Sequence, residues 1–465
     1  MKGTYRGRVV RLAAGLLMIL LLAGEAWAGV PAASKEEQPN PFGMLEALEE
    51  QMAAEGEPTV QIIDGAAIMG LDEVLPAAYD ARDEGKRPVV KSQGGLGTCW
   101  AITATSALEA ALLPGEHMVF SADHMSLRNG FHITQNEGGD YNMVMAYLSG
   151  WYGPVMEAED PYGDGVSPEG LEARVHVQEM QLLEGMDREQ IKNMIYRYGP
   201  VQTSLYMDRR TTSAALPYYN EEKSAYNYTK EESCTHDVLI LGWDDAFEKE
   251  NFASQPREDG AWICQNTWGE KFGEDGIFYV SYEDANIARG GVAYTKVVPA
   301  DYYDRIYQTD VCGWQGQQGY EQESCFFANV YTAQEDENLE AVGFYTTDKH
   351  SSYEIFIVEQ FADTGSFAKR RLLTGGFIEN SGYYTVPLTL PVELEAGQRF
   401  AVVVKITTEN AGKPVAVELH KDDYTDTVTL EGKEGYLSLY GDAWEYTEEK
   451  FGTNVCLKAY TRKRG

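Results

Sequence analysis

The chain has 465 residues, of which 43% are hydrophobic and 12% aromatic, so it is long enough for two or three domains with apolar cores. Its 73 acidic residues outnumber 38 lysines and arginines, and the formal net charge is −35. Such a charge repels phosphate backbones, so we expect no nucleic-acid partner. Because disordered acidic chains are usually poor in aromatics, the composition instead indicates folded domains with a strongly acidic surface.

Residues 1–28 have the pattern of a secretory signal peptide. Basic residues such as Lys2 and Arg11 precede the apolar run Leu12–Gly24, and Ala26-Trp27-Ala28 supplies a small-x-small cleavage site. The apolar run is shorter than the roughly 20 residues that a membrane-spanning helix needs. We therefore expect an exported protein, in a periplasm, on a cell surface or outside the cell, with no stable membrane span after signal removal.

Three segments follow the signal. Residues 29–74 are rich in Glu, Pro and Ala and are interpreted as a linker or short pro-segment, with one possible amphipathic helix around Met44 to Met52. Residues 75–298 alternate apolar helical and strand patterns. Residues 299–465 contain short β-rich runs between turn residues, which predict an all-β sandwich: Ala341–Tyr345, Tyr353–Val358, Tyr383–Leu388, Arg399–Ile406 and Val455–Tyr460. The predicted fold class is α+β followed by all-β.

Cys99 is the first candidate for chemistry. A glycine-rich stretch precedes it, and the apolar spacing from Ala101 to Leu112 predicts a helix that ends before Pro114-Gly115. A cysteine at a helix N-terminus is favoured as the thiolate, the form that attacks carbonyls. The alternative is a small buried core residue without a chemical role.

Other residues complete a constellation around that thiol. His236 begins the apolar run to Trp243, which predicts a buried strand that holds the imidazole at its end. Asn266 can orient the ring, with Trp268 shielding their hydrogen bond from water. Gln93, six residues before the thiol, can form an oxyanion hole with the backbone N–H of Cys99.

With these motifs the chain resembles the papain-like cysteine peptidases. The resemblance rests on four stretches, Leu75 to Arg82, Gln93 to Trp100, His236 to Trp243 and Asn266 to Tyr282. Gly138-Gly139 looks like the backbone strip that pairs with extended substrate in that family. The C-terminal segment resembles the lectin-like β-sandwich of exported bacterial members, through Tyr307-Gln308, Gly313-Trp314, Ala328 to Tyr331 and Ala341 to Thr347.

The resemblance implies a two-lobe peptidase domain over 75–298, with a helical lobe and a β-barrel-like lobe, and a lectin-like sandwich over 299–465. It implies peptide hydrolysis through a thioester on Cys99, with Gly138, Gly139 and Trp268 contacting substrate. Protein or peptide substrates are the expected partners, and carbohydrate or cell-envelope material is a candidate partner of the sandwich. No metal and no organic cofactor are expected.

The chain departs from the family pattern near the site. Thr98 and Thr267 stand where Ser is usual, and Asp237 follows the base where Ala is more frequent. The Asp237 carboxylate can raise the pKa of the imidazole or point away from it, since successive strand residues face opposite sides. We favour the second, which predicts that Asp237→Ala changes the acid limb of the pH profile little; a fall of the basic pKa by a full unit would contradict it.

The remaining cysteines allow two disulfides, one between Cys234 and Cys264 and one between Cys312 and Cys325. Two other functions stay open. One is a carbohydrate- or cell-wall-binding surface protein on an inactive papain-like scaffold. The other is a papain-like acyltransferase that delivers the acyl group to an amine, which a comparison of hydrolysis with amine incorporation would distinguish.

Overall fold

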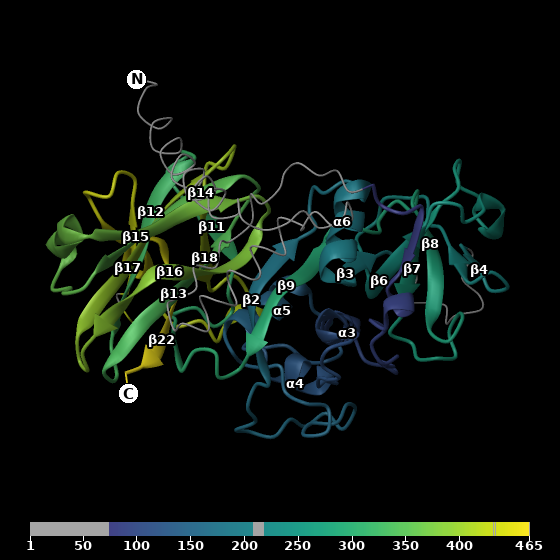
Figure 1. Cartoon of the computed structure of the whole chain (residues 1–465), viewed down its shortest axis with the longest axis horizontal. Helices are drawn as coiled ribbons and strands as arrows, with labels where there is room; N and C mark the ends of the chain where they lie inside the picture. Colours follow the sequence, from purple (N-terminus) through teal and green to yellow (C-terminus); the bar gives the residue numbers. More distant parts are fainter. Residues whose placement is uncertain (1–73, 208–217, 431, 433, 465) are drawn as a thin grey trace, which may run out of the picture. The chain divides into compact units, whose positions relative to one another are not determined.

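The computed structural model describes residues 74–207, 218–430, 432 and 434–464 (Figure 1). The expected signal peptide, nearly all of the expected linker and the helix around Met44 to Met52 lie outside the described residues. Within the described part of the chain, no helix is both long and apolar enough to cross a membrane.

The first part of the described chain contains the longer helices. They are α3 (Cys99–Leu112), α4 (Ala122–Leu127), α5 (Tyr141–Ser149) and α6 (Arg188–Tyr198). The first of these confirms the helix predicted after Cys99, with its last residue just before the Pro114 turn. Three of the four have side-chain caps at their N-termini, where backbone N–H groups have no partner inside the helix; Asp140, for example, accepts from Asn142 and Met143 at the start of α5.

Two large hydrophobic cores involve this part. The first joins α3, α4 and α5 to β2, through residues such as Trp100, Tyr147 and Met180. The second joins α6 to the remaining strands, through residues such as Ile195, Trp243 and Phe278. The strands are β1 (Ala78–Asp80), β2 (Val175–Leu182), β3 (Val201–Leu205), β4 (Tyr219–Asn220), β5 (Ala225–Tyr226), β6 (His236–Asp244), β7 (Ala261–Gln265), β8 (Ile277–Ser281) and β9 (Gly291–Pro299). These elements form a helical lobe and a β-rich lobe, as expected.

The second part is a β-sandwich. Its strands are β10 (Arg305–Tyr307), β11 (Gly316–Gln318), β12 (Ser324–Thr332), β13 (Glu337–Thr346), β14 (Ser351–Val358), β15 (Arg371–Ile378), β16 (Gly382–Leu394), β17 (Arg399–Thr408), β18 (Val415–Leu419), β19 (Gly435–Ser438), β20 (Glu445–Tyr446), β21 (Thr453–Val455) and β22 (Leu457–Lys463), with α7 (Thr447–Phe451) between the last ones. One layer has the order β15-β14-β17-β12-β19-β20, and the other contains β10-β22-β13-β16. Phe344 of β13 and Val404 of β17 meet in the core between them.

One feature of the topology was not predicted: the two parts share a sheet. The order β10-β22-β13-β16-β2-β9-β3-β6-β7-β8-β5-β4 runs without interruption from the sandwich into the β-rich lobe. The junction is the antiparallel pairing of β16 with β2, where Gly382 faces Gln181 and Tyr384 faces Glu179. The strand that begins at His236 therefore belongs to the same hydrogen-bonded sheet as the sandwich.

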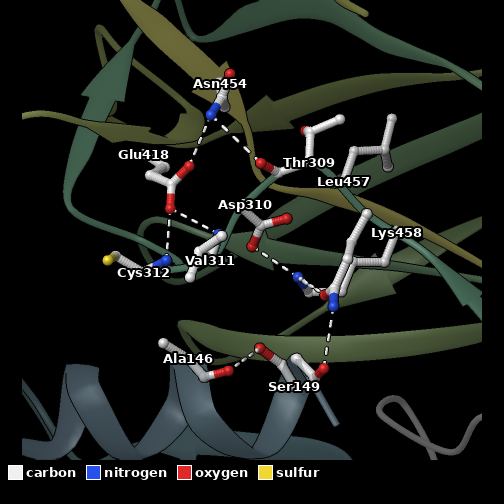
Figure 2. A network of polar contacts seen from close by, with 12 residues as sticks. Ala146, Ser149, Thr309, Asp310, Val311, Cys312, Glu418, Asn454, Leu457 and Lys458 are labelled. Carbon is white, nitrogen blue, oxygen red and sulfur yellow. Dashed lines mark hydrogen bonds and ion pairs between the residues drawn. The ribbon is translucent and has the colours of Figure 1, made fainter. Parts of the chain in front are cut away.

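A buried polar network connects the sandwich to the end of α5 (Figure 2). Lys458 Nζ lies 2.7 Å from Asp310 Oδ2, and both side chains are almost fully buried. Lys458 also donates to Gln308, whose own amide donates to the carbonyl of Gly150 after α5. Burial raises the pKa of the Asp310 carboxyl, and the Lys458 ammonium opposes that effect. Since an isolated buried charge is costly, the pair stabilises only the arrangement in which both partners are present.

The two predicted disulfides, Cys234–Cys264 and Cys312–Cys325, are wrong, because none of these four cysteines forms a disulfide. Cys264 faces Ile240 across β6 and β7, whereas Cys234 lies before β6 and points to the Asn286 carbonyl. Cys325 lies inside the sandwich on β12, while the Cys312 thiol contacts Thr427 and the Gly130 carbonyl. The two sulfurs of each proposed pair thus belong to different local environments.

Candidate active site

Cys99 is the first residue of α3 and is 9% exposed. Thr98, its N-cap, does not bond to the helix with its side chain; instead its hydroxyl contacts the Tyr162 hydroxyl, which donates to the Gln93 carbonyl. The threonine therefore keeps a polar role at the position where the family pattern has serine. The first N–H groups of α3 lie at the thiol, where they and the helix dipole favour negative charge.

His236 is the first residue of β6, and its ring is fixed from one side. The Nε2 atom lies 2.8 Å from Asn266 Oδ1, and both residues are buried. Asn266 Oδ1 also accepts from the backbone N–H of Thr267 at 2.7 Å. The indole of Trp268 lies beside the imidazole, with ring centroids 5.0 Å apart. The bond between the imidazole and the amide is thereby kept away from bulk water.

Gln93 joins the cysteine loop to the asparagine loop. Its backbone N–H donates to the Thr267 carbonyl at 2.8 Å, and its side-chain oxygen accepts from the Thr267 hydroxyl at 2.6 Å. With its oxygen engaged, the amide directs Nε2 the other way, where it donates to Leu96 O at 2.7 Å. Threonine at position 267 thus supplies the hydroxyl that orients the Gln93 amide.

Gln202 connects the helix that carries Cys99 to the strand that carries His236. Its Nε2 donates to the Trp100 carbonyl at 3.4 Å and to Asp237 Oδ2 at 2.8 Å. The residue after the thiol and the residue after the imidazole are thus joined through one amide. Gln202 was missed by the sequence analysis, although a polar residue on a buried strand was the available signal.

Asp237 has both carboxylate oxygens engaged by β3. Ser204 Oγ donates to Oδ1 at 2.6 Å, and Gln202 donates to Oδ2. This is the orientation favoured from strand alternation, across the sheet and toward β3. Burial raises the pKa of the Asp237 carboxyl to about 6, and the two hydrogen bonds oppose that effect.

Gly138 and Gly139 lie against the same region. Gly138 has φ +90°, and the Cβ that any other residue would carry at position 139 would lie 2.3 Å from the Trp100 ring. Any side chain at position 139 would therefore displace the indole next to Cys99. The backbone of this strip is left uncovered by side chains of its own, as pairing with an extended chain requires.

The described residues contain no group of three or more His, Cys, Asp or Glu side chains arranged to hold a metal ion.

Comparisons with known proteins agree with this geometry. Residues 75–299 match the model of the papain family cysteine protease, and residues 306–461 match that of the lectin like domain. A probable cysteine protease, RD19B of Arabidopsis thaliana, is 26% identical over 224 residues, which cover 44% of this chain and 58% of the relative. Procathepsin L of Rattus norvegicus is 24% identical over 217 residues, 46% of this chain and 62% of the relative. The chain thus spans about 58% of the first of these curated relatives.

Two solved structures cover more of the chain. The clostridial cysteine protease Cwp84 after propeptide cleavage superposes with a TM-score of 0.73 at 27% identity, over 83% of this chain and 99% of the other. The cysteine protease and lectin-like domains of Cwp84, described as a surface layer associated protein of Clostridium difficile, give 0.73 at 26% identity, over 84% and 89%. The likeness spans both parts of the fold.

Proposed function

We propose that this chain, which carries a papain family cysteine protease domain over 75–299 followed by a lectin like domain over 306–461, is an exported cysteine endopeptidase. The observation that carries the proposal is the bond between His236 and Asn266, buried under Trp268 and linked through Gln202 to the helix that begins at Cys99. An asparagine that holds one imidazole nitrogen prepares the other for proton exchange with a thiol.

In the proposed mechanism the Cys99 thiolate attacks the scissile carbonyl and forms a C–S bond. Because Asn266 holds Nε2 of His236, Nδ1 is the nitrogen that gives its proton to the leaving amine as the C–N bond breaks. Water then attacks the thioester, with the imidazole as its base, and the acid product leaves the thiol. The backbone N–H of Cys99 and the second N–H of the Gln93 amide, the one that does not donate to Leu96, bind the oxyanion in both steps.

Gly138 and Gly139 are proposed to pair with the substrate backbone, since residue 139 lies directly on the ring beside Cys99. Trp268 is proposed to cover the imidazole and border the cleft. Because backbone pairing is independent of side-chain identity, specificity must come from neighbouring pockets.

The proposed division of the chain is a signal over 1–28, a linker or short pro-segment over 29–74, a peptidase domain over 75–298 and a lectin-like domain over 299–465. Export is supported by the signal pattern and by the likeness to a surface layer associated protein. Carbohydrate or cell-envelope material is proposed as a further partner of the lectin-like domain. N-terminal sequencing of the processed protein should give Gly29 as its first residue, and an unprocessed N-terminus would contradict the proposed signal.

The deciding experiment uses the chain from Gly29 and its Cys99→Ala variant. A peptidyl epoxide should add to the wild-type protein, as measured by intact mass, and stop cleavage of an unfolded protein substrate. The variant should neither bind the epoxide covalently nor cleave, while its circular dichroism stays that of the wild type. Cleavage by a clean Cys99→Ala preparation would refute the thiol mechanism.

The same preparations test the acyltransferase alternative. Substrate is incubated with a fluorescent primary amine, and hydrolysis is compared with amine incorporation. If the amine is present at a concentration far below that of water and most products still carry it, the peptidase proposal would be replaced by acyl transfer. If the chain without residues 29–74 is not labelled and does not cleave the substrate, that result would favour the binding protein on an inactive scaffold.

A further inference from the structure

A hollow of about 410 Å³ lies where the two domains meet. Tyr141, Asn142 and Glu184 line it from the peptidase domain. Trp314, Gln315 and Gln317 line it from the lectin-like domain. Neither domain alone contains this site.

Two paths of contacts connect the hollow to the proposed catalytic residues. On the cysteine side, Gly139 lies against the Trp100 ring, and Tyr141 follows it two residues later at the start of α5. The substrate-pairing strip thus leads directly into the wall of the hollow.

On the histidine side, the path runs through β3. Ser204 bonds to Asp237, the residue after the imidazole, and the neighbouring Thr203 donates to the Gly290 carbonyl at 2.8 Å. A Cβ built on Gly290 would lie 3.7 Å from the Tyr141 ring and 3.8 Å from Glu184 Cγ. A chain of contacts through β3 therefore connects the wall of the hollow to the residue that follows the imidazole.

The charge of this region is negative. Glu184 lines the hollow and is exposed, and it accepts a hydrogen bond from Tyr141. Burial raises the pKa of Tyr141, and the carboxylates of Glu184, Asp140 and Asp237 add to that effect in this order of size. All three carboxylates thus act on one hydroxyl group at the wall.

Little positive charge offsets these carboxylates. None of the three has a basic partner among the ion pairs of the described residues. Lys349 Nζ donates to the carbonyl of Gly185, the residue after Glu184, at 2.6 Å and forms no ion pair with Glu184 among the described residues. The aromatic rings of Tyr141 and the half-buried Trp314 complete the wall.

A hollow lined by a carboxylate and by two aromatic side chains is a favourable environment for an ammonium or guanidinium group. We propose that this hollow binds a lysine or arginine side chain of the peptide substrate, and that the lectin-like domain thereby takes part in peptidase specificity through Trp314 and Gln317. The proposal rests on the proposed peptidase function and names its substrate class. A neutral sugar would match Trp314 and the amides equally well, but it would leave the negative charge unused.

The test is hydrolysis of matched peptides by the full chain from Gly29. Two pairs of internally quenched peptides differ at a single position, arginine against citrulline and lysine against norleucine, and that position is moved along the amino-terminal side of the scissile bond. At one position kcat/KM should be up to about fivefold higher for the cationic member, the upper end of what a solvent-exposed ion pair contributes. The preference should shrink in 0.5 M NaCl, since salt screens such charges.

Three variants assign the preference to the hollow. Glu184→Gln keeps an oxygen acceptor for Tyr141 and removes the charge, so it should abolish the cationic preference while neutral peptides keep their kcat/KM within about twofold. Gln317→Lys adds a positive charge to the exposed wall of the lectin-like domain and should weaken the preference in the same way. Glu222→Gln, an exposed carboxylate on the turn after β4, is the matched control and should leave it unchanged.

The outcomes separate this proposal from the one on which it rests. Cleavage of neutral and cationic peptides at equal rates at every position, or a preference that survives both Glu184→Gln and Gln317→Lys, would overturn the cation pocket and leave the peptidase intact. Absence of all cleavage would overturn the peptidase and the pocket with it. Calorimetry on the Cys99→Ala protein provides a readout without turnover: equal binding of both peptides, with Trp314-dependent binding of chitotriose, would assign the hollow to carbohydrate instead.

Discussion

The most quantitative prediction concerns Asp237, whose carboxylate is buried one residue from the proposed base. Burial raises its pKa from 3.8 to about 6, so between these values the folded protein binds a proton that the unfolded chain releases. Stability then falls as pH rises through this window, because the folded state must ionise a buried acid. At 1.36 kcal/mol for each pKa unit, the loss amounts to about 3 kcal/mol.

Asp237→Asn removes this ionisation and retains a side chain of the same size. The variant pays a constant cost for placing an NH₂ group near Gln202 or for turning the Gln202 amide, and that cost does not depend on pH. The free energy of unfolding of the variant relative to the wild type should therefore become more favourable by roughly 2 kcal/mol between pH 4 and pH 7, because the unfolded chain is already partly ionised at pH 4. The change with pH, rather than either absolute value, is the quantity to measure.

Urea unfolding at steps of half a pH unit provides the assay, with Cys99→Ala in both proteins to prevent self-cleavage. Glu222→Gln, at an exposed position, controls for general effects of removing one negative charge. Unfolding free energies of Asp237→Asn and the parent that run parallel from pH 4 to pH 7 would refute the reasoning. In the active chain, Asp237→Ala should leave the acid limb of the rate profile almost unchanged, because the β3 side chains hold its carboxylate.

Three further predictions address the site and the domain junction. Asn266→Ala removes the partner of His236 Nε2, and kcat should fall roughly 10- to 100-fold with the melting temperature nearly unchanged; unchanged kcat would show that the amide does not orient the base. Lys458→Met leaves the buried Asp310 charge unpaired and should cost about 3–5 kcal/mol in urea unfolding, most of it recovered by adding Asp310→Asn; a double variant as unstable as the single one would contradict the pairing argument. A chain that ends at Pro299 exposes the edge of β2 that pairs with β16 and should aggregate or melt earlier than the full chain, whereas equal melting would mean that the shared sheet contributes nothing.

Local patterns allowed correct prediction where local physics determines the structure. The spacing after Cys99 predicted α3, and the apolar run after His236 predicted β6, since each element buries a face that is visible in a few consecutive residues. The last expected strand, Val455 to Tyr460, is divided between β21 and β22 at Cys456. Such a break depends on two different neighbouring strands, β18 and β13, and no local pattern encodes that choice.

Long-range pairing could not be predicted in the same way. The cysteine pairs failed because spacing along the chain says little about which strands become neighbours. Gln202 escaped notice for a related reason: its role exists only when β3, α3 and β6 come together. The same holds for the hollow between Glu184 and Trp314, whose two walls come from distant parts of the chain.

The shared sheet has a consequence for how the site is maintained. From β16 of the sandwich, hydrogen-bonded neighbours run through β2, β9 and β3 to β6, which begins at His236. A shift of β16 on β2 by one residue would turn the side chains of the paired segment to the opposite face and break the alternation that buries Tyr383 and Met180. The register at the junction is therefore fixed by burial on both sides. Because β3 holds Gln202 and Ser204 in that same sheet, the sandwich contributes to the position of Asp237 and of the imidazole beside it, although it supplies no atom to the proposed reaction.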